Sequence, residues 1–503
     1  MLLSDLLYTH EYTSGWDAKE ISVTSIASNT KENIKGSVFV CIKGEHYDSH
    51  QEIRFLYENG ASAIIVQRGC VFERLANFPL FEVADSRRTL AYMWNRFCHD
   101  PSSKLKFIGI TGTNGKTTTS YILHQILTHA SFKTGLVGTI THKIGELDYI
   151  TSCHSEKDSR LSTMTTPDPD LLYPMLETMV KDGVKYVIME VSSHALLLDK
   201  VAPIHFHIGI FTNLTPEHLD THGSLENYLQ SKSKLFDICD IALFNADDAS
   251  TRILMKGSKA KNYTYALKND ANYRANDCVL NGLSSSTFIY SSEKHSYEIK
   301  AHLCGIYNIY NCLAATATAE LLGMEATTIK KSLLEIRNIP GRMEKIEIRA
   351  QEFEIYIDFA HTEYAMRNLL STIRTSINAN QRLVVLFGCG GDRDKSKRAK
   401  MGACAMELSD FAIITSDNAR SEDPKIIISD ILKGFTNAKK RRVILSREKA
   451  IEYAISNAKK GDIIVLIGKG HEKYEISGTE KKDFDERKIV AKAIEMKKRG
   501  YTT

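Results

Sequence analysis

The sequence predicts an α/β protein built from three domains, and three observations support this fold class. The chain has 503 residues, whereas one domain usually takes about 100–200 residues. Short apolar runs rich in β-formers alternate with helix-like stretches along the chain. One apolar run also leads directly into a glycine-rich turn and then a helical segment, which is the order expected in a parallel sheet with crossover helices.

The predicted elements fall into three groups. Residues 1–99 form a small N-terminal α/β domain with strands at 38–42 and 63–66. A Pro-Ser-Ser hinge at 101–103 then precedes the strand 105–110, the first of the central domain, 100–338. Its further strands, at 187–189, 207–211 and 241–244, are continuous apolar runs of the kind found in parallel sheets buried on both faces. After Ile339-Pro340-Gly341 a third alternation gives strands at 383–387, 411–414 and 463–467, and predicts a Rossmann-like C-terminal domain over 339–503.

Composition excludes several classes of protein. The chain has 65 basic and 61 acidic residues and a net charge of +4, whereas a dedicated nucleic-acid binder shows a stronger basic excess. The start of the chain lacks a signal-peptide pattern, and no run of about 18 apolar residues occurs, so we expect a cytoplasmic protein without a membrane partner. The ten cysteines are scattered singly, so they are expected to be reduced thiols and to form no structural metal site.

The glycine-rich turn has the residues of a phosphate-binding loop. It runs from Ile110 to Thr119, with a helix expected to start near Thr118. Glycines let backbone N–H groups close on phosphate oxygens, Lys116 can neutralise β/γ-phosphate charge, and the Thr117 hydroxyl can reach Mg²⁺. The generic spacing requires glycine at position 110, where this chain has Ile110, and the chain instead has Gly109 and Gly112. An ordinary strand-to-helix turn that contains a lysine by chance is the alternative.

The form TGTNGKTTT at 111–119 resembles the Mur ligases and the related folylpolyglutamate ligases, and further matches extend from residue 25 to residue 487. The resemblance implies an ATP site made by Gly112, Thr113, Asn114, Gly115, Lys116, Thr117 and Thr118. It also implies that Glu190, which ends a strand in MEVSSHAL, and His218 in TNLTPEHLD hold Mg²⁺ together with Thr117. By itself, a carboxylate that ends a strand is more often a cap or a salt-bridge partner, and the resemblance reverses this interpretation for Glu190.

Two lysines lie in the segment YLQSKSKLF, Lys232 and Lys234. Without the family either could be a surface lysine. Register with the family's YxxxKxxLF helix selects Lys232, whose family counterpart is carbamylated by CO₂ and becomes an anion beside metal and polyphosphate.

Further motifs carry the nucleotide contacts in the family. Asn308 and Asn311 in GIYNIYN would seat adenine, although two helix-capping asparagines are the alternative. Arg342 would contact the γ-phosphate, and Asp358 in IDFAHT would lie on the ribose side, with Glu363 replacing the family's usual proline. The resemblance therefore implies Lys116, Lys232, His218 and Arg342 as the catalytic residues.

The substrate motifs are the most telling part of the resemblance. The N-terminal segment and Thr30, Thr165, Thr166, Ser192, Lys200 and Lys232 match positions that bind UDP-MurNAc-dipeptide. The family's DSR is Asn29-Thr30-Lys31 here, and Lys200 replaces an arginine, so the planar guanidinium fork is lost at both places.

The diamino-acid positions of the family correspond to Arg393, Asp417, Asn418, Arg420, Gly468 and Glu472. Arg420 favours diaminopimelate over lysine, which lacks the distal carboxylate, unless Arg420 is simply solvated. Ala419 replaces a proline and loosens this loop.

The resemblance thus implies a monomeric ligase that uses ATP, Mg²⁺ and a carbamate on Lys232. It would join meso-diaminopimelate to the D-Glu carboxylate of UDP-MurNAc-L-Ala-D-Glu through an acyl phosphate. Three alternatives remain open: a lysine-adding version, a paralogue that joins another acid and amine, and a P-loop ATPase regulator without ligase activity. The absence of GxSxG or a Cys/His arrangement fits a mechanism without a protein nucleophile.

Overall fold

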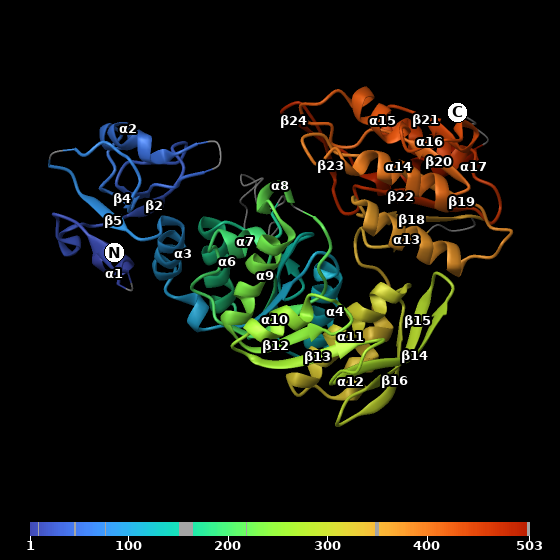
Figure 1. The fold of residues 1–503 in the computed structure, drawn as a ribbon, viewed down its shortest axis with the longest axis horizontal. Helices are drawn as coiled ribbons and strands as arrows, with labels where there is room; N and C mark the ends of the chain where they lie inside the picture. The colour runs from blue at the N-terminus through green and yellow to red at the C-terminus, as the bar shows by residue number, and fades with distance from the viewer. Residues whose placement is uncertain are drawn as a thin grey trace.

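The computed structural model describes residues 1–8, 10–44, 47–75, 77–149, 164–217, 219–347 and 352–499. Figure 1 shows three α/β lobes in chain order, with the N-terminal part in blue, the central part in cyan to yellow and the C-terminal part in orange to red. The predicted α/β class with parallel sheets is confirmed. The domain boundaries at 99/100 and 338/339 stay predictions.

The N-terminal sheet has the order β1-β5-β4-β3-β2 over the described residues. Its strands β2 to β5 pair in parallel, whereas β1 joins β5 antiparallel. The elements of this part are β1 (Tyr12–Thr13), β2 (Ser25–Ala27), β3 (Ser37–Val40), β4 (Ala63–Gln67), β5 (Leu80–Val83), α1 (Leu3–Leu6), α2 (Ile53–Glu58), α3 (Ser86–Phe97) and the 3₁₀ turns η1 (Ala18–Glu20), η2 (Ser49–Glu52) and η3 (Pro101–Ser103).

The central sheet has the order β16-β15-β14-β13-β12-β11-β6-β10-β7-β8-β9 among the described strands. Its strands are β6 (Lys106–Thr111), β7 (Thr134–Val137), β8 (His142–Ile144), β9 (Leu147–Asp148), β10 (Tyr186–Glu190), β11 (Phe206–Phe211), β12 (Cys239–Asn245), β13 (Lys261–Ala266), β14 (Tyr273–Asn281), β15 (Ser285–Ser291) and β16 (Ser296–Ala301). The helices are α4 (Lys116–His129), α6 (Pro169–Lys181), α7 (Ser193–Leu197), α8 (Leu219–His222), α9 (Leu225–Asp237), α10 (Thr251–Gly257), α11 (Ile306–Leu321) and α12 (Ala326–Glu335).

The middle of this sheet is parallel, as predicted, but both edges are antiparallel. Strands β14, β15 and β16 form a meander at one edge, and β7, β8 and β9 form another at the opposite edge. Residues in β14 to β16 alternate between more and less buried positions. This is the pattern of a sheet with one face in water, and it lacks the long apolar runs that reveal buried parallel strands.

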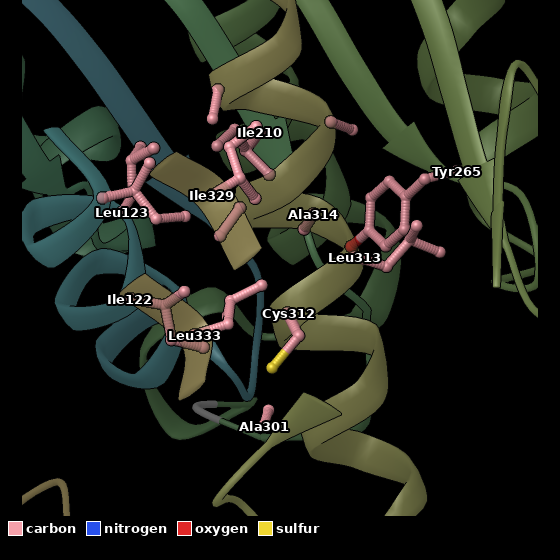
Figure 2. Packing of buried hydrophobic residues seen from close by; sticks show 14 of the residues in the cluster. Ile122, Leu123, Ile210, Tyr265, Ala301, Cys312, Leu313, Ala314, Ile329 and Leu333 are labelled. Atoms are coloured by element: carbon pink, nitrogen blue, oxygen red, sulfur yellow. The ribbon is translucent and has the colours of Figure 1, made fainter. Parts of the chain in front are cut away.

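Helices α4, α11 and α12 pack together against the central sheet. Figure 2 shows Ile122 and Leu123 of α4 facing Ile329 and Leu333 of α12, while α11 contributes Cys312, Leu313 and Ala314 to the same cluster. All of these side chains are buried. The cluster therefore fixes α4, whose first turn follows the glycine-rich loop, against α11.

The C-terminal sheet has the order β17-β18-β22-β19-β20-β21, and β23 and β24 form a separate hairpin. Strands β18 to β22 pair in parallel. The elements are β17 (Glu344–Lys345), β18 (Glu354–Asp358), β19 (Leu383–Phe387), β20 (Phe411–Ile414), β21 (Arg441–Val443), β22 (Ile463–Ile467), β23 (Tyr474–Ser477), β24 (Glu480–Asp483), α13 (Glu363–Ser376), α14 (Lys397–Leu408), α15 (Pro424–Leu432), α16 (Arg447–Ser456), α17 (Glu486–Lys498) and η4 (Ala438–Lys440).

Candidate active site

The glycine-rich loop between β6 and α4 depends on two glycines. Gly112 has φ +143°, and a Cβ at this position would lie 2.0 Å from Oγ1 of Thr212. Gly115 has φ +87°, and a Cβ there would lie 2.5 Å from Oδ1 of Asn311. Because L-residues rarely adopt these backbone conformations, only glycine lets the loop pack this tightly. Helix α4 begins at Lys116, two residues before the expected start near Thr118.

Hydrogen bonds with Asn213, which follows β11, and with the Lys116 side chain stabilise the conformation of the glycine-rich loop. The N–H of Thr113 donates to the carbonyl of Asn213 at 2.8 Å, and the N–H of Asn114 donates to Oδ1 of Asn213 at 2.9 Å. The ammonium of Lys116 donates to the carbonyls of Gly112 and Thr113 at 2.8 and 2.9 Å. Burial lowers the pKa of Lys116. The loop thus presents a partly buried cation at the N-terminus of a helix, where anions bind.

Glu190 ends β10, which lies beside β6, so its carboxylate reaches the same sheet edge as the loop. Its side chain is fully buried. Oε2 accepts hydrogen bonds from the hydroxyls of Thr117 and Thr139, both at 2.9 Å, and Oε1 accepts one from the N–H of Thr139 at 3.0 Å. Thr139 was missed by the sequence analysis because it belongs to none of the motifs. It also contacts the predicted substrate residue Thr165, with 3.0 Å between the two hydroxyl oxygens.

Lys232 and Lys234 lie in very different surroundings on α9. Lys232 is 1% exposed, and its ammonium lies 4.1 Å from the ring centre of Tyr228. Burial, reinforced by the nearby charge of Lys116, lowers the pKa of Lys232 well below its usual value. The Lys234 side chain is 42% exposed and lies 3.8 Å from Asp199. Burial therefore distinguishes the two lysines independently of the motif.

His218, the other predicted metal ligand of this segment, lies outside the described residues. Its neighbour Glu217 contacts His361 of the C-terminal part at 3.3 Å. Among the residues that the structure describes, no three His, Cys, Asp or Glu side chains come together as a metal-binding group.

The two predicted adenine-side asparagines lie in the first turns of α11, where both are buried. Asn311 Nδ2 donates to Asn308 Oδ1 at 3.1 Å, and Asn308 Nδ2 donates to the carbonyl of Cys304 at 2.8 Å. Oδ1 of Asn311 accepts from the Thr119 hydroxyl at 3.3 Å. The pair therefore lies against the start of α4, next to the loop. Thr118, in the same first turns of α4, is also buried.

Arg342 reaches from the C-terminal part into the loop. Its NH2 donates to Oγ1 of Thr117 at 3.2 Å, and its guanidinium lies 4.9 Å from the ring centre of Phe359. The nearby Asp358 accepts hydrogen bonds from the N–H groups of Met343 and Ala360, at 2.7 and 2.8 Å. Burial raises the pKa of the Asp358 carboxyl. Thr117 therefore joins Glu190 of the central sheet and Arg342 of the C-terminal part at one point.

A cavity of about 440 Å³ lies between the N-terminal and central parts. It is lined by Ser28, Asn29, Thr30, Glu32, Ile42, Gly44, Tyr47, Ser49, Arg87, Leu90, Asp168, Pro169, Asp170, Leu198 and Lys200. Of the predicted residues, Thr30 and Lys200 line it, and the Lys200 ammonium pairs with Asp168 at 2.6 Å. Lys31 is exposed and is not part of the lining. Arg87 also lines the cavity, and it was not predicted from the sequence because it belongs to none of the motifs.

Thr166 and Ser192 lie between that cavity and the loop. The Thr166 hydroxyl donates to the carbonyl of Glu190 at 2.8 Å, and the N–H of Ser192 donates to Thr166 Oγ1 at 3.0 Å. The Ser192 hydroxyl caps α7. Predicted residues of the sugar-peptide site and the metal site are thus in direct contact.

The predicted amino-acid residues cluster at the ends of β20 and β22. Asn418 Nδ2 donates to Oε2 of Glu472 at 2.8 Å. A Cβ on Gly468 would lie 2.6 Å from Oδ2 of Asp417. Arg420 has φ +52° and its NH1 donates to the carbonyl of Gly391 at 2.8 Å. Burial and, second, the charge of nearby Arg393 lower the pKa of Arg420.

Arg393 itself is exposed, and its NH1 donates to the carbonyl of Asp392 at 3.0 Å. The structure thus gathers most of the predicted residues of the amino-acid site around Asn418 and leaves Arg393 at the rim.

No helix among the described residues is long and apolar enough to cross a membrane.

Comparison with known proteins identifies the family. The Mur ligase middle domain matches residues 110–319, and the Mur ligase, glutamate ligase domain matches residues 341–470. The UDP-N-acetylmuramoyl-L-alanyl-D-glutamate–2,6-diaminopimelate ligase of Clostridium perfringens is 39% identical over 503 residues, covering 99% of this chain and 100% of that protein. The enzyme of the same name from Caldanaerobacter subterraneus is 38% identical over 479 residues, covering 94% and 95%. A solved structure of a ligase with this name covers 100% of both chains with 27% identity and a TM-score of 0.67. The chain therefore belongs to the Mur ligase family.

Proposed function

We propose that this ATP-dependent ligase adds meso-2,6-diaminopimelate to the D-Glu γ-carboxylate of UDP-MurNAc-L-Ala-D-Glu, a step of peptidoglycan precursor synthesis in the cytoplasm. One observation carries the proposal most directly. The Thr117 hydroxyl donates to Glu190 and accepts from Arg342. The phosphate-type loop, a carboxylate of the central sheet and a cation of the C-terminal part therefore meet where phosphoryl transfer needs them.

We assign the three substrates to three neighbouring regions. ATP takes the loop at 112–118, with adenine near Asn308 and Asn311 and ribose near Asp358. The UDP-sugar takes the cavity lined by Thr30 and Lys200, with its peptide extending past Thr165, Thr166 and Ser192. The diamino acid takes the region of Asp417, Asn418, Arg420, Gly468 and Glu472, with Arg393 at its rim. We also propose domain boundaries of 1–99, 100–338 and 339–503, since each range holds one of the three large sheets among the described residues.

The reaction follows from two displacements. An oxygen of the D-Glu γ-carboxylate attacks the γ-phosphorus and ADP leaves, which gives an acyl phosphate. The neutral amine then attacks the carbonyl carbon, the tetrahedral intermediate loses inorganic phosphate, and the amine proton departs. Lys116 and Arg342 stabilise charge on the transferred group, which is the largest contribution a protein makes to such reactions.

The residues present fit a magnesium ion. The Thr117 hydroxyl and the buried Glu190 carboxylate are hard oxygen donors that lie 2.9 Å apart, and Mg²⁺ usually takes one or two carboxylates plus phosphate and water oxygens. His218 is proposed as a further ligand. The ion would neutralise phosphate charge during transfer.

Lys232 is proposed to carry a CO₂-derived carbamate. Only the neutral amine adds to CO₂, and burial lowers the pKa of Lys232, which increases the neutral fraction. The ammonium first loses one proton, and addition of the neutral amine to CO₂ releases a second, so that a carboxylate replaces the cation. That anion would serve as a metal ligand and as a contact for the UDP-MurNAc-dipeptide.

Arg420 is proposed to bind the distal carboxylate of diaminopimelate. Its guanidinium is half-buried, and burial lowers its pKa, so a bound carboxylate would compensate the cost of the buried charge. Lysine offers no such carboxylate.

The test measures phosphate release from ATP and Mg²⁺ with UDP-MurNAc-L-Ala-D-Glu and either meso-diaminopimelate, L-lysine or no amino acid. Product mass is checked in parallel. We expect release only with diaminopimelate and a product of the matching mass. Turnover with lysine but not with diaminopimelate would contradict the role of Arg420. A lack of turnover with both amino acids would point to a ligase for another acid and amine.

A further inference from the structure

The β23–β24 hairpin lies directly against the loop that carries Asn418 and Arg420. The N–H of Arg420 donates to the carbonyl of Ile476 at 3.2 Å, and the N–H of Gly478 donates to the carbonyl of Arg420 at 2.7 Å. These two bonds hold Arg420 from both sides of its backbone. Since Ala419 lacks the fixed φ of a proline, the hairpin supplies the restraint that this loop otherwise loses.

The same hairpin determines how the Asn418 amide is turned. Its Oδ1 accepts from the N–H of Ile476 at 3.0 Å and from the Lys469 ammonium at 3.1 Å. Lys469 is fully buried and also donates to the carbonyl of Tyr474 at 2.7 Å. With two donors on Oδ1, the amide nitrogen must point the other way. It donates to Oε2 of Glu472.

Tyr474 supplies the second donor to the Glu472 carboxylate. Its hydroxyl lies 3.3 Å from Oε1 of Glu472, whereas Asn418 binds Oε2. Each carboxylate oxygen therefore has one donor from the protein, which fixes the plane of the carboxylate. Burial and the negative charge of Asp417 raise the pKa of the Glu472 carboxyl. Donors to both oxygens counter that effect because they favour the charged form.

Tyr474 is itself held in place. It is the first residue of β23 and pairs with Asp483 across the hairpin. The ammonium of Lys481 lies 3.9 Å from its ring centre, and Lys469 holds its carbonyl. A side chain fixed at its backbone and its ring face can orient a partner without a large loss of conformational entropy on binding.

We propose that Tyr474 is a positioning residue for the incoming diamino acid, acting by holding the Glu472 carboxylate where it meets the substrate ammonium. The proposal rests on the proposed function, since it takes the diamino acid as the ligand of this region. Tyr474 is not a catalytic residue, because it acts through Glu472. Its removal weakens amino-acid binding and leaves the phosphoryl-transfer groups around Thr117 unchanged.

The test is the substitution Tyr474→Phe, which removes one oxygen atom and keeps the ring, so the variant folds. Steady-state kinetics are measured for each substrate in turn with the other two saturating. We expect the KM for meso-diaminopimelate to rise about tenfold or more, as for the loss of one hydrogen bond to a charged group. The kcat and the KM values for ATP and UDP-MurNAc-dipeptide stay within about twofold of wild type. Tyr364→Phe, at an exposed tyrosine in the first turn of α13, is the matched control and changes none of these values.

A double-mutant cycle separates positioning from a general structural effect. In the Glu472→Gln background, Tyr474→Phe should change the KM for diaminopimelate by less than about twofold, because the two residues act as one unit. Equal KM effects in both backgrounds would overturn the proposal, and so would an unchanged KM in the single variant or a parallel rise of all three KM values. If the wild-type enzyme shows no turnover that depends on diaminopimelate, the proposed function fails instead, which the wild-type measurement reveals first.

Discussion

Replacing Lys232 by methionine should abolish activity without destabilising the protein. The Lys232 side chain is 1% exposed, and its pKa is strongly lowered by burial and by Lys116. Among the described residues no carboxylate lies within ion-pair distance of this ammonium. In buffer freed of CO₂ and Mg²⁺, the fold therefore buries an amine that gains no ion pair from the described part of the chain, and only the more distant charge of Glu217 favours its ammonium form. Methionine has a similar length and no charge to bury.

The expected size of each effect follows from that environment. Exchanging buried charged groups for apolar side chains of similar volume is neutral or stabilises by about 1–4 kcal/mol, and we expect the lower half of that range here. At roughly 2–4 °C per kcal/mol for a domain of 150–250 residues, the Tm of Lys232→Met should be unchanged or up to about 8 °C higher. Activity should fall by about 100-fold or more, as when one group that stabilises developing charge is removed.

Two measurements decide between the outcomes. Thermal unfolding is followed in nitrogen-sparged buffer, and phosphate release is followed with all three substrates and bicarbonate. Lys234→Met is the matched control on the same helix, and it should leave activity unchanged and stability within about 0.5 kcal/mol, as is usual for surface positions. A Lys232→Met enzyme with wild-type turnover would refute the proposed role. A Tm several degrees below wild type would refute the argument from burial.

Three further predictions concern two residues of the site and one ion pair of the C-terminal part, Arg398–Glu422. Gly112→Ala places a Cβ 2.0 Å from Thr212 Oγ1 at φ +143°, so calorimetry should show ATP binding at least about tenfold weaker, equivalent to 1.4 kcal/mol; unchanged affinity would contradict the tight loop. Arg420→Met should raise the KM for diaminopimelate about 10- to 100-fold, whereas an unchanged KM would mean that Arg420 is only solvated. Arg398 lowers the pKa of the Glu422 carboxyl from 4.5 to about 2, so this carboxylate stabilises the fold above pH 4.5 and loses that effect as pH falls toward 2. The Tm difference between wild type and Glu422→Gln should shrink over this window, and a difference that grows on acidification would contradict the assignment.

Much of the site could be predicted from the sequence because its chemistry depends on local pattern. A phosphate loop needs glycines at positions of unusual backbone geometry, followed directly by lysine and threonine, and such a signal survives without tertiary information. The strands that carry it are continuous apolar runs, so β6, β10 and β11 were found within a residue or two of their ends. Helix α4 started earlier than expected because Lys116 and Thr117 join its first turn.

Other features carried no local signal. Thr139 binds both oxygens of Glu190 from 51 residues away, and Arg87 lines the same cavity as Lys200. Neither residue type is unusual in its own segment. The antiparallel strands β14 to β16 were missed because their alternating, half-exposed residues resemble surface loops more than the buried runs of a parallel sheet.

By itself, the sequence determined the class of fold, the family and the nucleotide loop, because each of these depends on patterns within short stretches of consecutive residues. Only the tertiary structure decided which groups meet. It buried Lys232 and left Lys234, two positions along the same helix, partly exposed. It joined Thr117 to both Glu190 and Arg342, and it placed the β23–β24 hairpin against Asn418. Burial, pKa and hydrogen-bond partners depend on residues that are distant in the chain, and these contacts exist only once the sheets have packed together.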